Sequence, residues 1–155
     1  MFEFKSQHAK QKRVVGLDFG MARIGVAVSD GSRLIATPIC VLACEKKTDA
    51  TVEKLFKELK KHQELYNYEI EEIVIGLPLL LSGKKGLLAD EVAYFVEALK
   101  KQSSIPVITW DERLTTAQAE RSLNESSLTR KRRSQVVDTV AAIIILQSYL
   151  DFKRI

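Results

Sequence analysis

The chain has 155 residues, 46% of them hydrophobic, a net charge of +4 and two cysteines. This length and apolar content suit a single domain with a buried core. No stretch approaches the roughly 18 to 20 uninterrupted apolar residues of a membrane span, and the segment Met1 to Ser6 lacks the apolar run of a signal peptide. We therefore expect a cytoplasmic protein without a membrane partner. Cys40 and Cys44 have poor spacing for zinc and are expected to be small core or surface residues.

The first half of the chain predicts three consecutive strands after a polar arm. Residues 1–12 have no clear period, so we expect an arm of uncertain order there and one domain over residues 13–155. Strands are expected at 13–19, 23–29 and 34–42. The short turn Gly20-Met21-Ala22 predicts a hairpin between the first two. Pro38 predicts that the third strand lies at an edge or a bulge.

In the second half, helices alternate with short strands. Thr48 or Asp49 is expected to cap a helix that ends near Leu65. The further expected elements are a strand at 72–77, a helix whose apolar stripe runs from 88 to 99, a strand at 105–110, a short helix from 115 or 116 to about 124, a basic loop at 124–133 and a helix at 134–150. Three antiparallel strands followed by strands that arrive through helices predict an α/β fold with a mixed five-stranded sheet flanked by helices.

Asp18 ends the apolar run that forms the first strand. Val14, Gly16 and Asp18 share one face of the strand, and the other face is also apolar. This pattern is typical of a central strand whose last inward position is an acid. The alternative is an aspartate that caps the turn before Gly20.

Asp111 and Glu112 follow another apolar strand. They are adjacent, so the pleat sends them to opposite faces, and at most one of them joins a common site with Asp18. The alternative for either is an acid favoured by the dipole of the next helix.

Asp138 interrupts the apolar pattern of the last helix. Its neighbours three and four positions on are Ala141 and Ala142, so it lies on the small-residue side that must pack on the sheet. The alternative is a solvent-exposed acid in the first turns of the helix.

Three carboxylates brought together without a cation would repel one another and raise their own pKa values. Mg²⁺ or Mn²⁺ would relieve that repulsion, because both prefer oxygen ligands. Two such ions about 4 Å apart are the arrangement that activates water in phosphodiester cleavage. The sequence therefore predicts a metal-dependent nuclease with Asp18, Glu112 or Asp111, and Asp138 in its site.

Five segments together resemble the YqgF family of RNase H-like proteins, also described as Holliday junction resolvases. They are VGLDFG at 15–20, RIGVAVSD at 23–30, GLPL at 76–79, DERLTT at 111–116 and the stretch 137–150. The likeness extends from about Arg13 to Asp151, with the motifs in family order. It implies an RNase H-like fold and places the acidic site on Asp18, Glu112 and Asp138.

The resemblance also implies a substrate and partners. It implies 5′-end processing of the pre-16S ribosomal RNA, with ribosomal particles as possible partners, and for some members resolution of DNA junctions. The sequence leaves open the choice between RNA and junction DNA, and the oligomeric state. Nucleic-acid phosphates are expected to contact the basic residues, which are Arg23, Lys84, Lys85, Arg113, Arg130, Lys131, Arg132 and Arg133.

Other classes of protein explain less of the sequence. An ATPase of the actin and sugar-kinase type shares the acid, glycine and hairpin of the first strand pair, but it closes two such domains around its nucleotide. A ribosome-associated or nucleic-acid-binding factor that does not cut would gain from losing acids beside phosphates. A purely structural dimer module leaves the three acids unexplained. A nuclease needs divalent metal bound by the three acids, a binding factor does not, and an ATPase needs nucleotide together with the metal.

Overall fold

The computed structural model describes residues 9–77, 87–111 and 130–154, with side chains from Ala89 and from Thr139 onward in the last two ranges. Its elements are β1 (Gln11–Phe19), β2 (Arg23–Ser29), β3 (Ala36–Ala43), α1 (Thr48–Tyr66), β4 (Tyr68–Leu77), α2 (Leu87–Gln102), β5 (Val107–Asp111) and α4 (Arg130–Lys153). The short helix expected at 115 or 116 to 124 lies outside these residues.

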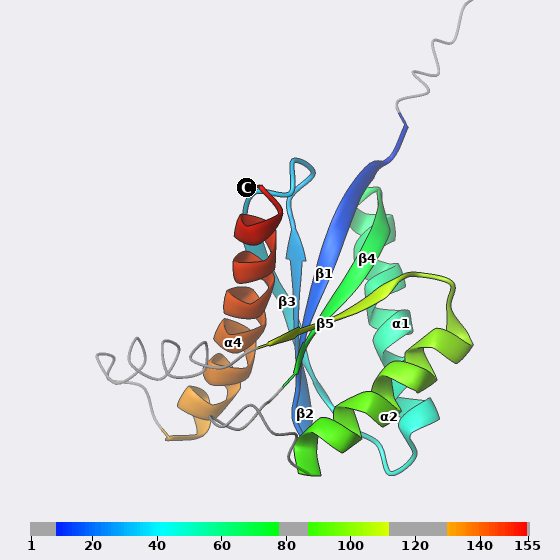
Figure 1. The fold of residues 1–155 in the computed structure, drawn as a ribbon, viewed down its shortest axis with the longest axis vertical. Coiled ribbons are helices and arrows are strands. Elements are labelled where there is room, and N and C mark those ends of the chain that lie inside the picture. Colours follow the sequence, from blue (N-terminus) through cyan, green and yellow to red (C-terminus); the bar gives the residue numbers. More distant parts are fainter. Residues whose placement is uncertain (1–8, 78–86, 112–129, 155) are drawn as a thin grey trace, which may run out of the picture.

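The five strands form one mixed sheet in the order β3-β2-β1-β4-β5 (Figure 1). β2 pairs antiparallel with β1 and β3, whereas β4 pairs parallel with β1 and β5. β1 is therefore the central strand, as the apolar pattern on both of its faces predicted. The expected α/β fold with three antiparallel strands followed by parallel ones is confirmed.

Pro38 satisfies both expectations for the third strand. β3 lies at an edge of the sheet. The β2–β3 register also shifts between Val26 and Ala27, whose partners are Cys40 and Pro38. A residue that donates no backbone hydrogen bond is tolerated at such a place.

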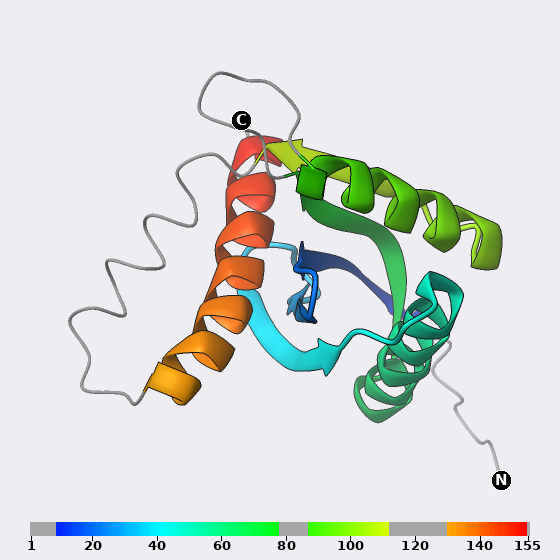
Figure 2. The same ribbon diagram turned by 90° about the horizontal axis from the view of Figure 1, so that it is seen from below.

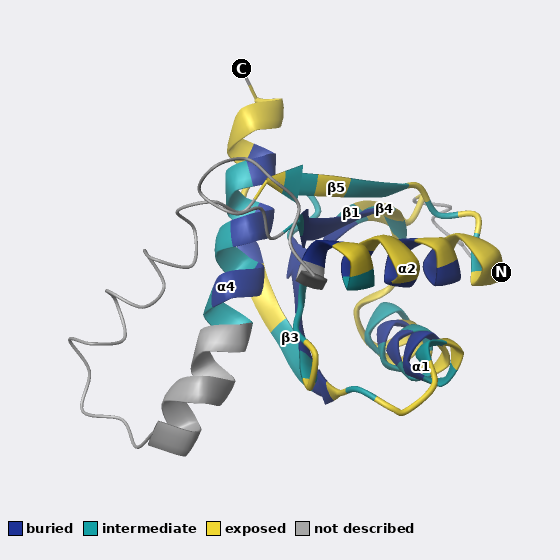
Figure 3. Cartoon of the chain, turned by 60° about the horizontal axis from the view of Figure 1, so that its bottom comes forward, coloured by how far each residue is buried: buried dark blue, intermediate teal, exposed yellow. Residues whose placement is uncertain are grey.

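The helices form a layer on each side of the sheet. α4 covers one face, and α1 and α2 cover the other (Figures 1 and 2). The sides of α1 and α2 that face the sheet are buried and their outer sides are largely exposed, whereas the outward residues of α4 are of intermediate exposure from Thr139 to Leu150 (Figure 3). No helix within the described ranges is long and apolar enough to cross a membrane.

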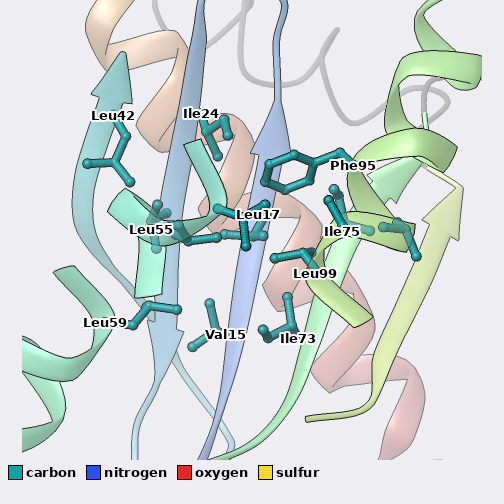
Figure 4. Packing of buried hydrophobic residues seen from close by; sticks show 14 of the residues in the cluster. Val15, Leu17, Ile24, Leu42, Leu55, Leu59, Ile73, Ile75, Phe95 and Leu99 are labelled. Carbon is teal, nitrogen blue, oxygen red and sulfur yellow. The ribbon is translucent and has the colours of Figure 1, made fainter. Parts of the chain in front are cut away.

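Two apolar clusters fill the space between these layers. The larger lies between the sheet and the α1/α2 layer and contains Leu17, Leu55, Ile75, Phe95 and Leu99 among others (Figure 4). The smaller lies under α4 and is built from Val14, Ala27, Ala36, Val74, Ala142, Ile145, Leu146, Tyr149 and Leu150. β1 contributes alternate residues to both clusters, as a strand covered on both faces must.

Several element boundaries differ from the expected ones. β4 begins at Tyr68 rather than at residue 72, and β1 begins at Gln11, inside the expected arm. The two extensions pair with each other, since Gln11 lies opposite Tyr68 in the parallel ladder. β3 and β5 are each shifted toward the C-terminus by one or two residues relative to expectation. Pairing between distant segments set these ends.

The helix starts were also predicted incorrectly. The N-cap of α1 is Lys47, without a side-chain cap bond, rather than Thr48 or Asp49. α4 begins at Arg130 rather than at 134, so the basic run at 130–133 forms the first turn of a helix and not a loop. At its other end α1 stops before Asn67, whose left-handed conformation (φ 53°) turns the chain directly into β4.

Candidate nucleic-acid and metal site at the end of β1

Asp18 lies near the C-terminal end of the central strand and faces α4. Val14, two pleats earlier on the same face, belongs to the apolar cluster under α4. A Cβ built on Gly16, between them, would lie 2.6 Å from Leu146 Cβ of α4. The strand alternation therefore directs the half-buried Asp18 toward the α4 side of the sheet.

Glycines surround Asp18 on this face. Gly25 of β2 lies directly opposite Asp18 in the antiparallel ladder. Gly76 of β4 is on the same face, because Val74, two residues earlier, packs in the cluster under α4. Neither glycine has a side chain to cover the carboxylate. The sequence reasoning missed this feature, although a glycine inside a strand pattern signals close approach of another group.

α4 runs antiparallel to β1. Val14 lines a surface cavity together with Tyr149 and Leu150. Gly16, further along β1, lies against Leu146 and the carbonyl oxygen of Ala142. Residue numbers along α4 thus fall as β1 advances toward Asp18 (Figure 1).

Asp138 belongs to α4, one helical turn before Ala142. The structure describes its backbone within the helix and not its side chain. A turn of helix advances about 5.4 Å, and the antiparallel course directs that turn toward the Asp18 end of β1. The predicted packing on the sheet is confirmed for Ala142, which belongs to the cluster under α4, and Ala141 is also buried.

Asp111 lies on the opposite face of the sheet from Asp18. Ile108 and Trp110 of β5 pack in the cluster under α4, whereas Val107 packs in the cluster on the α1/α2 side. Asp111 alternates with Trp110 and lies opposite Leu77, which also contacts the α1/α2 cluster. Of the two adjacent acids, Asp111 is thus separated from Asp18 by the sheet. Glu112 lies outside the described residues.

The predicted basic contacts are described only in part. Arg23 opens β2 at the same end of the sheet as Asp18, and its carbonyl oxygen accepts the Gly20 N–H at 2.9 Å, which closes the hairpin turn. Lys84, Lys85 and Arg113 lie outside the described residues. The predicted basic cluster Arg130, Lys131, Arg132 and Arg133 is described as helix backbone alone, and no acid occupies that first turn.

Of the remaining reactive groups, Cys44 lies near this end of β1, where its thiol donates to the Gly20 carbonyl at 3.5 Å, but it packs on the α1/α2 side of the sheet. His62, expected in polar surroundings, instead lies beside Tyr66 and Tyr68, with Nδ1 2.7 Å from the Tyr68 hydroxyl. Cys40 and Cys44 are free, partly buried thiols, as expected, and burial raises the pKa of both. Among residues whose side chains are described, no three His, Cys, Asp or Glu gather as metal ligands.

A surface cavity of about 330 Å³ lies toward the other end of β1. Several of its polar groups bond to one another. Arg33 pairs with Glu71 at 2.6 Å, and the Tyr149 hydroxyl donates to Glu72 at 2.5 Å.

Similarity to known proteins agrees with this geometry. The family model described as RuvX, Holliday junction resolvase, matches residues 12–152. A protein of Protochlamydia amoebophila named "Putative pre-16S rRNA nuclease" is 57% identical over 142 residues, which cover 92% of this chain and 95% of the relative. A protein of Desulforudis audaxviator with the same name is 43% identical over 143 residues, covering 92% and 96%.

A solved structure shares the fold. It is T. thermophilus RuvC in complex with a Holliday junction substrate, which superposes with a TM-score of 0.53 at 15% identity and covers 92% of this chain and 96% of that one. The expected RNase H-like fold and the resemblance to the YqgF family are thereby confirmed. The chain belongs to the RuvX (YqgF) family of resolvase-like nucleases.

Proposed function

We propose that this protein is a metal-dependent nuclease that hydrolyses phosphodiester bonds during 5′-end processing of the pre-16S ribosomal RNA. The observation that carries the proposal is the place of Asp18, near the end of the central strand on the α4 face, beside glycines and near the turn of α4 that contains Asp138. The names of the similar proteins supply the substrate. Such a substrate implies action in the cytoplasm, in contact with ribosomal particles.

The third acid of the proposed site is Glu112 rather than Asp111. The pleat turns Asp111 away from Asp18, toward the α1/α2 side. In a continuing strand the next residue would turn back to the α4 side. Glu112 is also the acid that the family resemblance implies.

The donor set fits a hard cation. Carboxylate oxygens are the ligands that Mg²⁺ and Mn²⁺ prefer. Gly25, opposite Asp18, has no side chain that would compete for the space. Asp18, Glu112 and Asp138 would hold the metal, expected as two ions, and the ions would supply an activated water and stabilise the leaving oxygen.

The basic residues would hold the phosphates without reading the sequence. Four consecutive cations in the first turn of α4 oppose the positive end of the helix dipole, and no acid there compensates for them. A bound polyanion would relieve this repulsion. Arg23, at the Asp18 end of β2, and Lys84, Lys85 and Arg113 would extend the same contacts.

Resolution of DNA four-way junctions is the second candidate function. The description of the matching family model favours it. Both substrates carry the same phosphodiester chemistry, so the three acids would serve either one. A binding factor that does not cut remains the alternative from another class.

The test compares cleavage of a precursor 16S RNA fragment and of a four-way DNA junction, with Mg²⁺, Mn²⁺ or EDTA. Wild type would be assayed beside Asp18→Asn and a charge-matched control, Asp90→Asn, which changes an exposed acid of α2. We expect metal-dependent cutting that Asp18→Asn loses and Asp90→Asn keeps, with RNA as the better substrate. Cutting by Asp18→Asn at the wild-type rate would refute the proposed site. Tight binding in EDTA with no cutting under any condition would favour the binding factor.

A further inference from the structure

Three consecutive residues of α4 fasten this helix to three different parts of the sheet. Gln147 Nε2 donates to the Leu34 carbonyl at 2.8 Å, and its Oε1 accepts the Ala36 N–H at 2.9 Å, at the start of β3. Ser148 Oγ accepts Nε1–H of Trp110 in β5 at 3.1 Å. The Tyr149 hydroxyl donates to Glu72 of β4 at 2.5 Å. We call Gln147, Ser148 and Tyr149 the α4 anchor.

The α4 anchor restrains rotation and sliding of α4 on the sheet. Apolar contacts restrain these motions only weakly, because they have no preferred direction. Successive helical residues point about 100° apart, so Gln147 and Tyr149 hold opposite flanks of the helix. Leu146 and Ala142 pack tightly against β1 over Gly16. Such a contact sets how near the helix comes, whereas directional hydrogen bonds on both flanks set its orientation.

Ring packing reinforces the bond to β5. The Trp110 ring meets Tyr149 edge-on, with centroids 5.4 Å apart, and Phe152 at 5.2 Å. Trp110 lies opposite Gly76 of β4, which has no side chain on that face. β5 is an edge strand of five residues with intermediate or exposed side chains, so contact with α4 supports an element that has little burial of its own.

The α4 anchor is far from the proposed site and acts on it through the helix. Ser148 and Asp138 are ten positions apart in α4, or about 15 Å along the axis. A tilt of about 10° at the anchor would move the far position by about 2 to 3 Å, whereas a catalytic constellation tolerates about 0.5 Å.

We infer that Ser148 and Tyr149, with Trp110 and Glu72 as their partners, are positioning residues that hold Asp138 of α4 in register with Asp18 of β1. The inference rests on the proposed function, because it concerns the alignment of the proposed site. It predicts that removing a hydrogen bond of the α4 anchor weakens metal binding and turnover without removing any group from the site itself.

The test uses two tyrosines that lose the same hydroxyl. Tyr149→Phe removes the bond to Glu72, whereas Tyr68→Phe removes the bond to His62 on the α1 side of the sheet. Both side chains are buried, 3% and 1% exposed, so a purely structural role predicts similar effects for both. Ser148→Ala removes the bond to Trp110, and Ser148→Thr, which keeps the hydroxyl, serves as the rescue variant.

Each variant would be assayed for kcat, KM, Mn²⁺ affinity by calorimetry, and folded fraction by circular dichroism at the assay temperature. We expect Tyr149→Phe and Ser148→Ala to lower kcat about tenfold or more and to weaken Mn²⁺ binding at nearly constant KM, since small misalignments cost that much. Ser148→Thr and Tyr68→Phe should match wild type once the folded fraction is taken into account.

The controls separate this inference from the proposed function. Equal kcat and Mn²⁺ affinity in Tyr149→Phe, Ser148→Ala and Tyr68→Phe, with Asp18→Asn inactive, would overturn the positioning role and keep the nuclease. Full activity of Asp18→Asn would remove the proposed function itself. Effects of Tyr149→Phe that disappear after correction for unfolded protein would likewise assign the α4 anchor to stability alone.

Discussion

The two faces of the sheet are packed in different ways. On the α1/α2 face, large side chains such as Leu17, Leu55 and Phe95 interlock in the larger apolar cluster. On the α4 face, glycine and alanine bring one helix close, and hydrogen bonds from the α4 anchor orient it. Asp18 lies on the α4 face. Large apolar side chains thus stabilise the fold on one face, whereas small residues and directional hydrogen bonds on the other face align the helix that contains Asp138.

The largest effect should come from the two adjacent acids that the sheet separates. Glu112→Gln is expected to lower cleavage by about a thousandfold, because losing a metal ligand removes several kcal/mol of transition-state stabilisation. Asp111→Asn, on the other face, should keep activity within a few-fold of wild type. Single-turnover cleavage rates measure both. The reverse order would mean that Asp111 is the site acid and that the two faces are assigned wrongly.

A cavity in the α1/α2 face should reduce stability without altering the chemistry. Leu55 is fully buried in the larger cluster, and Leu55→Ala is expected to cost about 2 to 5 kcal/mol of unfolding free energy. Urea unfolding measures the loss, and kcat per folded molecule should stay near wild type. A large fall in kcat per folded molecule would show that this face also aligns the site.

A methyl group added to the α4 face should affect both properties. In Gly16→Ala the new Cβ would meet Leu146 Cβ at 2.6 Å, so α4 must shift. We expect a loss of about 1 to 3 kcal/mol together with reduced kcat per folded molecule. Gly31→Ala is the matched control, since the three atoms nearest its Cβ would all belong to the flexible end of Gln11. Equal behaviour of the two variants would contradict close packing of α4 on β1.

The basic first turn of α4 should affect binding more than chemistry. Replacing Arg132 and Arg133 by alanine is expected to weaken nucleic-acid binding and to make the slope of log K against log salt shallower by about 1.4 to 1.8, at 0.7 to 0.9 per phosphate contact. Replacing Lys57 and Lys60, exposed on α1, removes the same charge and should leave the slope unchanged. An unaltered slope in the arginine variant would mean that the first turn of α4 does not contact phosphates.

The smallest effect concerns His62 on the α1 side. Burial, and secondarily the charge of Arg13, lowers the pKa of His62 below its usual 6.5. The unfolded chain therefore takes up this proton first, so the stability contributed by neutral His62 is present above about pH 6.5 and is lost as pH falls through the lower folded pKa. Between pH 7.5 and pH 5, the urea midpoint should fall less in His62→Gln than in wild type. An identical fall would mean that His62 titrates alike in both states.

Local hydrophobic patterns predicted several elements and the faces of their residues correctly. β2 has the expected bounds, and the apolar stripes of α1 and α2 face the core. The face of Asp18 and the close packing of Ala141 and Ala142 followed from strand and helix periodicity. Periodicity is local, because it depends only on whether each residue prefers burial, and it needs no knowledge of the partner.

Only the tertiary structure decided the features that depend on pairing between distant segments. The starts of β1 and β4 were missed because their first, largely polar residues are ordered by each other. The face of Asp111 became definite only when Trp110 and Leu77 were placed in opposite clusters. The α4 anchor joins residues up to 113 positions apart, and no local spacing encodes such a contact. The sequence by itself thus determined which acids are candidates. The tertiary structure decided on which side of the sheet Asp18 and Asp111 lie.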